Sequence, residues 1–249
     1  MSPNLLGLLT LSVLAACGSD PGGDVADAPE SLDGSVDGAV TPDGPSVVPL
    51  CEGAEASDDF ERASLGASWI TWVNSQCSIA NNSDLAQASA NNWCYAVYST
   101  TFAADQVSEA VISVDKPAGI LTQVFVRQQP VGTPSGNGAR YGFHYNADPG
   151  DAQWEIKYDG VMTAETRVWT NATAGAPVPG DRLRIEVRGT DPVEIRGLHN
   201  GVEILSVVDS VPQRIAVTGH SGVVERNAGG TSASPNSPVW ESWCGGALP

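Results

Sequence analysis

Apolar and polar residues alternate with a period of two along short segments in the second half of the chain. In Arg182–Arg188, aliphatic residues at every second position would face one side of an extended strand and charged residues the other. Comparable runs predict further strands at Val107–Val114, Ile120–Arg127, Arg140–Tyr145, Gln153–Tyr158, Val193–Leu198, Val202–Val208, Val211–Val217, Val223–Glu225 and Val239–Trp243. Turn-forming residues separate these runs, and helix signals are almost absent. The pattern therefore predicts an all-β antiparallel sandwich or barrel.

The first residues carry an export signal. An apolar run from Leu5 to Ala16 is too short to span a bilayer comfortably and ends in Leu14-Ala15-Ala16-Cys17, which resembles the lipobox of bacterial lipoproteins. The resemblance implies that residues 1–16 are removed and that Cys17 is acylated, so the protein is anchored to a membrane. No Lys or Arg precedes the run, unlike the family pattern. The alternatives are a secretory peptide with an incidental cysteine, or a buried helix.

Residues 17–50 are expected to form a disordered tether behind this cysteine. Residues 18–50 hold seven acidic residues and no Lys or Arg, and they are rich in Gly, Pro, Ser and Ala. Such a composition buries too little apolar surface to offset its chain entropy. A calcium-binding Asp repeat is the alternative, but the spacing fits no known loop. In the lipoprotein family, the absence of an acidic residue after the cysteine favours the outer membrane.

Residues 51–249 remain as one β-sandwich domain with twelve basic and 22 acidic residues. This acidic balance argues against nucleic acid as a partner. The domain has four cysteines, and an even number in an exported protein indicates disulfides. We expect Cys51–Cys244, which would join the domain ends, and Cys77–Cys94, which would span a short polar stretch. Zinc is the weaker alternative, because no cysteine pair is closely spaced and no His lies near.

The order of several short motifs resembles the concanavalin A-like lectin/glucanase superfamily, in particular a LamG-like jelly roll. These motifs are Asp59-Phe60-Glu61-Arg62, Trp69, Val124–Arg127, Tyr141-Gly142-Phe143, Leu183–Val187, Leu198–Gly201 and Gly219–Gly222. The resemblance implies two curved sheets whose concave face or rim loops bind sugars or proteins. It also implies one structural Ca²⁺, for which Asp58 and Asp59 are candidates. The alternative for these two residues is a solvated turn. No other cofactor is expected.

Catalytic motifs are missing from the sequence. The glucanase branch of the superfamily uses a Glu-x-Asp-x-Glu strand, and this chain has none. Glu155 and Glu186 stand alone on their strands, followed at the next same-face position by Lys157 and Arg188, which favours surface ion pairs. Gly219-His220-Ser221-Gly222 resembles a truncated nucleophile elbow, but a turn before a strand explains it better.

Aromatic residues suggest a ligand site. Tyr141, Tyr145 and Trp154 lie in two successive predicted strands, with the cation Arg127 just before them, and flat rings beside fixed donors suit a sugar. Alternatively, these rings form the core-facing stripe of both strands. The leading hypothesis is a surface-tethered lipoprotein whose non-catalytic jelly roll binds carbohydrate or another cell-envelope ligand. The alternatives are a divergent glycan-active enzyme and a purely structural or adhesion lipoprotein.

Overall fold

The computed structural model describes residues 54–71, 77–80, 83–87, 94–115, 120–130, 138–147, 150–160, 166–227 and 238–248. The predicted signal peptide (1–16), Cys17, the tether (17–50) and Cys51 lie outside these residues and remain predictions. In the described part of the chain, no helix is long and apolar enough to cross a membrane.

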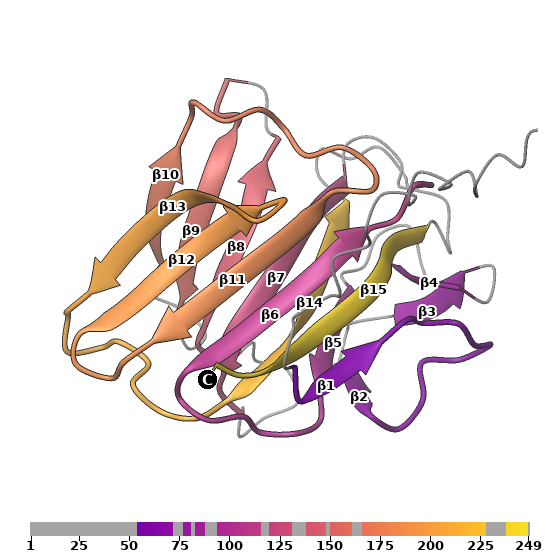
Figure 1. Cartoon of the computed structure of the whole chain (residues 1–249), viewed down its shortest axis with the longest axis horizontal. Coiled ribbons are helices and arrows are strands. Elements are labelled where there is room, and N and C mark those ends of the chain that lie inside the picture. Colours follow the sequence, from indigo (N-terminus) through magenta and orange to yellow (C-terminus); the bar gives the residue numbers. More distant parts are fainter. Residues whose placement is uncertain are drawn as a thin grey trace, which may run out of the picture. The chain divides into compact units, whose positions relative to one another are not determined.

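Two antiparallel sheets form the fold, and Figure 1 shows one in front of the other. The eight-stranded sheet has the order β13-β12-β11-β6-β15-β4-β3, and β1 also pairs with β15. Its strands are β1 (Ala56–Asp58), β3 (Cys77–Ala80), β4 (Asp84–Gln87), β6 (Gln106–Ile112), β11 (Arg182–Arg188), β12 (Val193–His199), β13 (Val202–Asp209) and β15 (Pro238–Ala247). The seven-stranded sheet has the order β10-β9-β8-β7-β14-β5-β2. Its strands are β2 (Trp69–Thr71), β5 (Cys94–Tyr98), β7 (Ile120–Gln128), β8 (Arg140–Asn146), β9 (Gln153–Asp159), β10 (Thr166–Asn171) and β14 (His220–Asn227).

This arrangement confirms the all-β antiparallel sandwich that the alternation predicted. The expected strand at Val211–Val217 is wrong. That segment forms bends and turns between β13 and β14, with the Arg214 backbone N–H donating to the Val211 carbonyl at 3.1 Å. Only Ile215 of its apolar residues is fully buried, and its N–H donates to a side chain, the Tyr141 hydroxyl, at 3.0 Å. A turn that buries one aliphatic side chain therefore takes the place of the predicted strand.

The core lies between the inner faces of the two sheets. In β11, burial alternates strictly, and Leu183, Ile185 and Val187 face the core. From the seven-stranded sheet, Phe143 and Trp154 enter the same core cluster. Their rings are stacked with centroids 5.0 Å apart, a geometry that adds to the stabilisation from burial alone. One shared apolar layer therefore holds the two sheets together, and each strand also has an outer face that points away from this layer.

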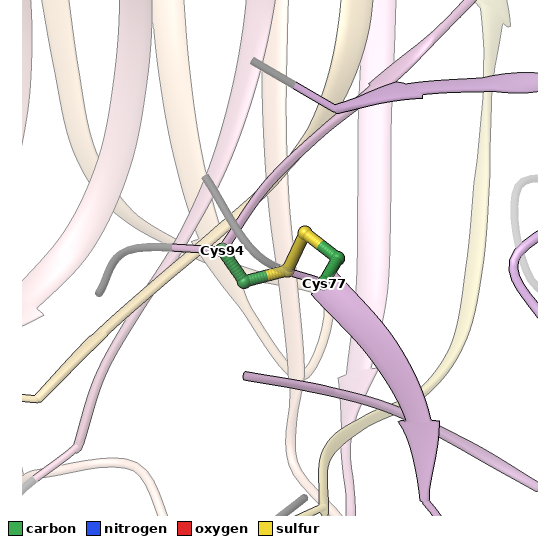
Figure 2. Close-up of a disulfide and its surroundings, with 2 residues drawn as sticks. All are labelled: Cys77 and Cys94. Atoms are coloured by element: carbon green, nitrogen blue, oxygen red, sulfur yellow. A yellow bond between two sulfur atoms is a disulfide. The ribbon is translucent and has the colours of Figure 1, made fainter. Parts of the chain in front are cut away.

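A disulfide between Cys77 and Cys94 connects the sheets, as Figure 2 shows. Cys77 begins β3 of the eight-stranded sheet and Cys94 begins β5 of the seven-stranded sheet. The predicted pairing is therefore present, and by loop entropy a closure of this length contributes about 3 kcal/mol. Cys244 is buried and disulfide-bonded. Because Cys51 lies outside the described residues, the Cys51–Cys244 pairing remains a prediction.

Candidate functional site

Two of the aromatic residues expected to bind a ligand belong to the core. Tyr141 and Trp154 have no exposed surface. The Tyr141 hydroxyl donates to the Asp209 carboxylate at 2.6 Å, and burial, followed by this hydrogen bond, raises the pKa of Tyr141. The Trp154 indole N–H donates to the Gly175 carbonyl at 2.9 Å. Tyr145 is partly buried against the same cluster, with its ring 5.4 Å from that of Trp154. The structure therefore places Tyr141 and Trp154 in the core between the sheets, which agrees with the alternative that these rings form the core-facing stripe, and it leaves Tyr145 partly exposed.

Arg127 is a buried structural cation. It has a positive φ of 53° and lies where the register of β7 and β14 shifts. Its guanidinium donates to three carbonyls from separate loops, at 2.6 Å to Ala104, 2.5 Å to Ile215 and 2.6 Å to Gly189. Burial lowers its pKa. Since its side chain is fully buried, its donors hold loops together and do not reach a ligand.

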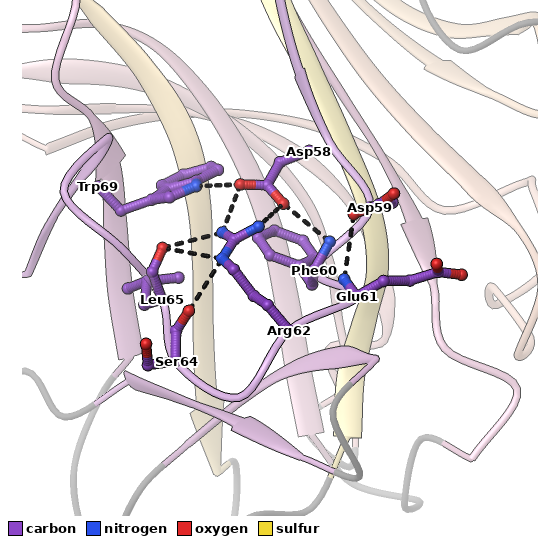
Figure 3. A network of polar contacts seen from close by, with 8 residues as sticks. All are labelled: Asp58, Asp59, Phe60, Glu61, Arg62, Ser64, Leu65 and Trp69. Carbon is purple, nitrogen blue, oxygen red and sulfur yellow. Dashed lines mark hydrogen bonds and ion pairs between the residues drawn. The ribbon is translucent and has the colours of Figure 1, made fainter.

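Asp58 is the last residue of β1 and Asp59 follows it, and Figure 3 shows their network. The Asp58 carboxylate accepts two hydrogen bonds from the Arg62 guanidinium, at 2.6 and 2.5 Å, and one from the Trp69 indole at 2.6 Å. Burial raises the pKa of Asp58, but the hydrogen bonds from Arg62 and Trp69 outweigh it and leave the pKa below 3.8. Asp59 accepts from the Glu61 N–H at 3.0 Å.

These contacts give Asp58 a different role from the metal ligand that was expected. Both of its oxygens already accept hydrogen bonds, so Ca²⁺ would have to displace the guanidinium of Arg62. Among the described residues, no group of three or more His, Cys, Asp or Glu side chains is arranged to hold a metal. The observed Asp58–Arg62 pair instead fixes the loop between β1 and β2.

The outer face of the seven-stranded sheet carries a polar row that crosses three strands. Gln123 of β7 lies opposite His144 of β8, and His144 lies opposite Glu155 of β9. The Gln123 amide nitrogen is 3.2 Å from His144 Nδ1, and His144 Nε2 is 3.1 Å from Glu155 Oε2. Antiparallel register alone thus brings together residues that are distant in the sequence.

The other oxygen of Glu155 is also engaged. Oε1 accepts from the Asn146 amide at 3.2 Å and from the Gln153 amide at 3.4 Å. Burial raises the pKa of Glu155, but the hydrogen bond and charge of His144, together with these two amides, outweigh burial. The pKa of Glu155 therefore lies below its ordinary value of 4.5, and the carboxylate is ionised at neutral pH.

A second group on this face combines charge with aromatic rings. The Arg140 guanidinium donates to Asp159 Oδ2 at 2.9 Å, and Lys157 Nζ lies 3.3 Å from Asp159 Oδ1. The same guanidinium lies over the ring of Tyr95, 4.9 Å from its centroid, and 5.8 Å from that of Phe125. Tyr95 and Phe125 belong to a small apolar cluster separate from the main core. This face therefore carries rings and hydrogen-bonding groups side by side, with the rings of Tyr95 and Phe125 themselves buried.

The alternation along β8 and β9 already contained these residues. Tyr141, Tyr145 and Trp154 lie on one face of these strands, while His144 and Glu155 lie on the opposite face. The sequence predicts an ion pair between Glu155 and Lys157. Instead Glu155 pairs with His144, and Lys157 pairs with Asp159. The sequence signal for these residues was the set of polar side chains at alternate positions, which in a sandwich face away from the core.

The two antiparallel sheets form a jelly-roll sandwich, and solved structures share this fold. β-Agarase A in complex with oligoagarose matches with a TM-score of 0.53 and 10% identity, over 76% of this chain and 89% of the agarase. A protein of unknown function with a galectin-like fold from Bacillus subtilis matches with a TM-score of 0.51 and 14% identity, over 78% of this chain and 95% of its own. An immunostimulatory antigen and pseudo β-1,3-glucanase of Mycobacterium tuberculosis matches with a TM-score of 0.52 and 9% identity, over 80% of this chain and 100% of its own. At these identities the likeness establishes the fold. No family model and no curated protein sequence matches the chain.

Proposed function

We propose that this protein is a lipid-anchored cell-envelope protein whose sandwich binds a carbohydrate without cleaving it, on the outer face of the seven-stranded sheet. The fold is shared with a β-agarase solved with oligoagarose, which supports a carbohydrate ligand. The observation that carries the proposal is the polar row Gln123–His144–Glu155 beside Tyr95 and Phe125. Fixed amide, imidazole and carboxylate groups are the kinds of donor and acceptor that sugar hydroxyls require, and the buried rings hold them in place.

Solvent reaches this face at its margin. His144 and Glu155 are only 4% and 7% exposed, whereas the side chain of Lys157 is 34% exposed. Asn146 and Gln153, at the ends of β8 and β9, are partly exposed and donate to Glu155. In this proposal the margin contacts the ligand first, and the buried row fixes the orientation of the marginal amides.

The arrangement of carboxylates favours binding over hydrolysis. Glu155 and Asp159 are the carboxylates of the described residues on this face of β9, and each already has a basic or imidazole partner. They are four residues apart on one strand, so their backbones are about 13 Å apart, whereas glycoside hydrolases place two carboxyl groups roughly 5–10 Å apart. Glycan cleavage therefore remains the second candidate.

A panel of polysaccharides tests the proposal. The full chain carrying Cys17→Ser, which cannot be acylated at that position, should bind at least one neutral envelope or storage polysaccharide in affinity electrophoresis. Lys157→Ala should weaken that binding, and Arg196→Ala, which removes an exposed cation from the outer face of the other sheet, should not. Release of reducing ends during incubation would favour the enzyme. Absence of retardation by any polysaccharide would refute binding.

The anchor is tested separately in cells. The unaltered chain should partition into the detergent phase with the membrane fraction, and Cys17→Ser should move to the soluble exported fraction. Mass spectrometry of the mature N-terminus should find a modified Cys17. An unmodified terminus at another residue would contradict lipidation without affecting the proposed ligand.

A further inference from the structure

A pocket of about 680 Å³ opens at the N-terminal side of the sandwich. It lies beside the loop of Figure 3, which connects β1 of one sheet to β2 of the other. Its walls include Leu65 of that loop, Tyr98 of β5 and Trp243 of β15. The volume falls within the range of small-molecule sites.

The strongest charges at this pocket are already neutralised by one another. Arg62 donates to both oxygens of Asp58 and also to the carbonyls of Ser64 and Leu65. Asp58 accepts in addition from the Trp69 indole and the Phe60 N–H. These bonds hold in place the loop that forms one wall of the pocket, so this wall needs little ordering when a ligand binds.

A different set of groups remains available to a ligand. Ser57, Ser68, Tyr98 and Ser242 line the pocket, and within the described residues none of their hydroxyls makes a hydrogen bond. Asp59 also lines it, and its Oδ1 accepts only from the Glu61 N–H. Hydroxyls both donate and accept, whereas an ionised carboxylate only accepts.

We propose that this pocket is a second binding site, which takes a short neutral saccharide of one or two rings. Four hydroxyls and one carboxylate match a ligand that offers several hydroxyls of its own, and the partly exposed Leu65 supplies apolar wall. Arg62 also lies within electrostatic range of Asp59 but is paired with Asp58, so the two carboxylates and one guanidinium leave the pocket with a net negative charge, which disfavours uronic, sulfated or phosphorylated sugars. The site therefore selects neutral over anionic saccharides.

This pocket is independent of the outer-face site. Tyr98 faces inward on β5, where its ring is stacked on that of Trp243 with centroids 5.0 Å apart. Tyr95, on the same strand, has the opposite parity and joins the outer-face cluster with Phe125. The two sites lie on opposite sides of β5, so a variant in one leaves the groups of the other in place.

Chemical-shift titration of the full chain with Cys17→Ser tests the proposal. The probes are glucose, maltose, cellobiose, lactose and glucuronic acid at concentrations up to about 10 mM, which would saturate a site with a Kd near 1 mM. At least one neutral probe should shift the amides of residues 57–68, 98 and 242 in a saturable way. Ser68→Ala/Ser242→Ala should weaken this binding roughly tenfold, because two hydrogen bonds are lost.

Two control variants separate the possible outcomes. Tyr98→Phe keeps the stacked ring and removes only the hydroxyl, so weakened binding with an unchanged melting temperature assigns the hydroxyl to the ligand. Lys157→Ala should leave binding to this pocket unchanged. Saturable shifts confined to the outer face, equal binding of glucuronic acid, or no saturable shift with any probe would each overturn the second site. The last result would leave polysaccharide binding by the outer face unaffected.

Discussion

The two faces of β8 and β9 share the same strands and differ in almost every chemical respect. On the inner face, Tyr141 and Trp154 are closed in by the other sheet, and their polar atoms bond to Asp209 and to the Gly175 carbonyl. On the outer face, His144 and Glu155 bond to one another and to amides of neighbouring residues. The comparison teaches that rings alone do not mark a ligand site in a sandwich. The polar side chains of the same strands face away from the other sheet, and they reach solvent at their margin, where the side chain of Lys157 is 34% exposed.

The largest expected difference between the faces is in stability. Trp154→Ala should lower the free energy of unfolding by about 3–5 kcal/mol, because it leaves a cavity beside Phe143 and an unpaired Gly175 carbonyl. Lys157→Ala on the same strand is the matched control. Chemical denaturation of both variants measures the difference. A loss below about 1 kcal/mol for Trp154→Ala would mean that the inner face is not a packed core.

A smaller effect is expected from one hydroxyl. Tyr141→Phe keeps the ring but removes the donor to Asp209 and the acceptor for the Ile215 N–H, at a cost of about 1–3 kcal/mol. Tyr145→Phe should be neutral within about 0.5 kcal/mol, since within the described residues its hydroxyl makes no hydrogen bond. Equal melting temperatures for the two variants would show that the buried Tyr141 hydrogen bonds add nothing.

The His144–Glu155 pair on the outer face should make the free energy of unfolding depend on pH. The folded pKa of Glu155 lies below 4.5, so folding favours its ionised form. Its contribution to stability is therefore fully present above the unfolded pKa and is lost as the pH falls through the folded value. Glu155→Gln should flatten the loss of stability between neutral and acid pH, measured by denaturation at several pH values. Glu194→Gln, on β12, controls for the removal of one negative charge. An unchanged acid slope in Glu155→Gln would contradict the His144–Glu155 pair.

The smallest effect on stability is expected from Lys157, whose side chain is partly exposed to solvent. Lys157→Ala should change the free energy of unfolding by no more than about 0.5 kcal/mol, because its ion pair with Asp159 is partly exposed. The same variant should lower polysaccharide affinity several-fold. Affinity electrophoresis and thermal unfolding of one preparation measure both quantities. A destabilised Lys157→Ala with normal affinity would assign this margin to the fold and remove it from the site.

Local pattern by itself determined the fold class and much of the strand content. Alternation in β11 and the Asn200-Gly201 turn between β12 and β13 are properties of a few consecutive residues, so they could be seen before folding. The Cys77–Cys94 pairing was predicted from a short separation and an even cysteine count, and it is present. The segment Val211–Val217 is as rich in apolar residues as segments that form strands. In the structure its Ile215 N–H bonds to Tyr141, which is 74 residues away, so the local pattern could not predict its conformation.

Only the tertiary structure decided which parity faces outward and which groups meet. A period of two sorts residues into two sets without saying which set the second sheet covers. Register then joined Gln123, His144 and Glu155 into one row across three strands. In the same way, the guanidinium of Arg127 is buried because carbonyls from three loops converge on it. Contacts between distant segments are set by strand pairing and packing, so the sequence could supply the residues of this site but not their arrangement.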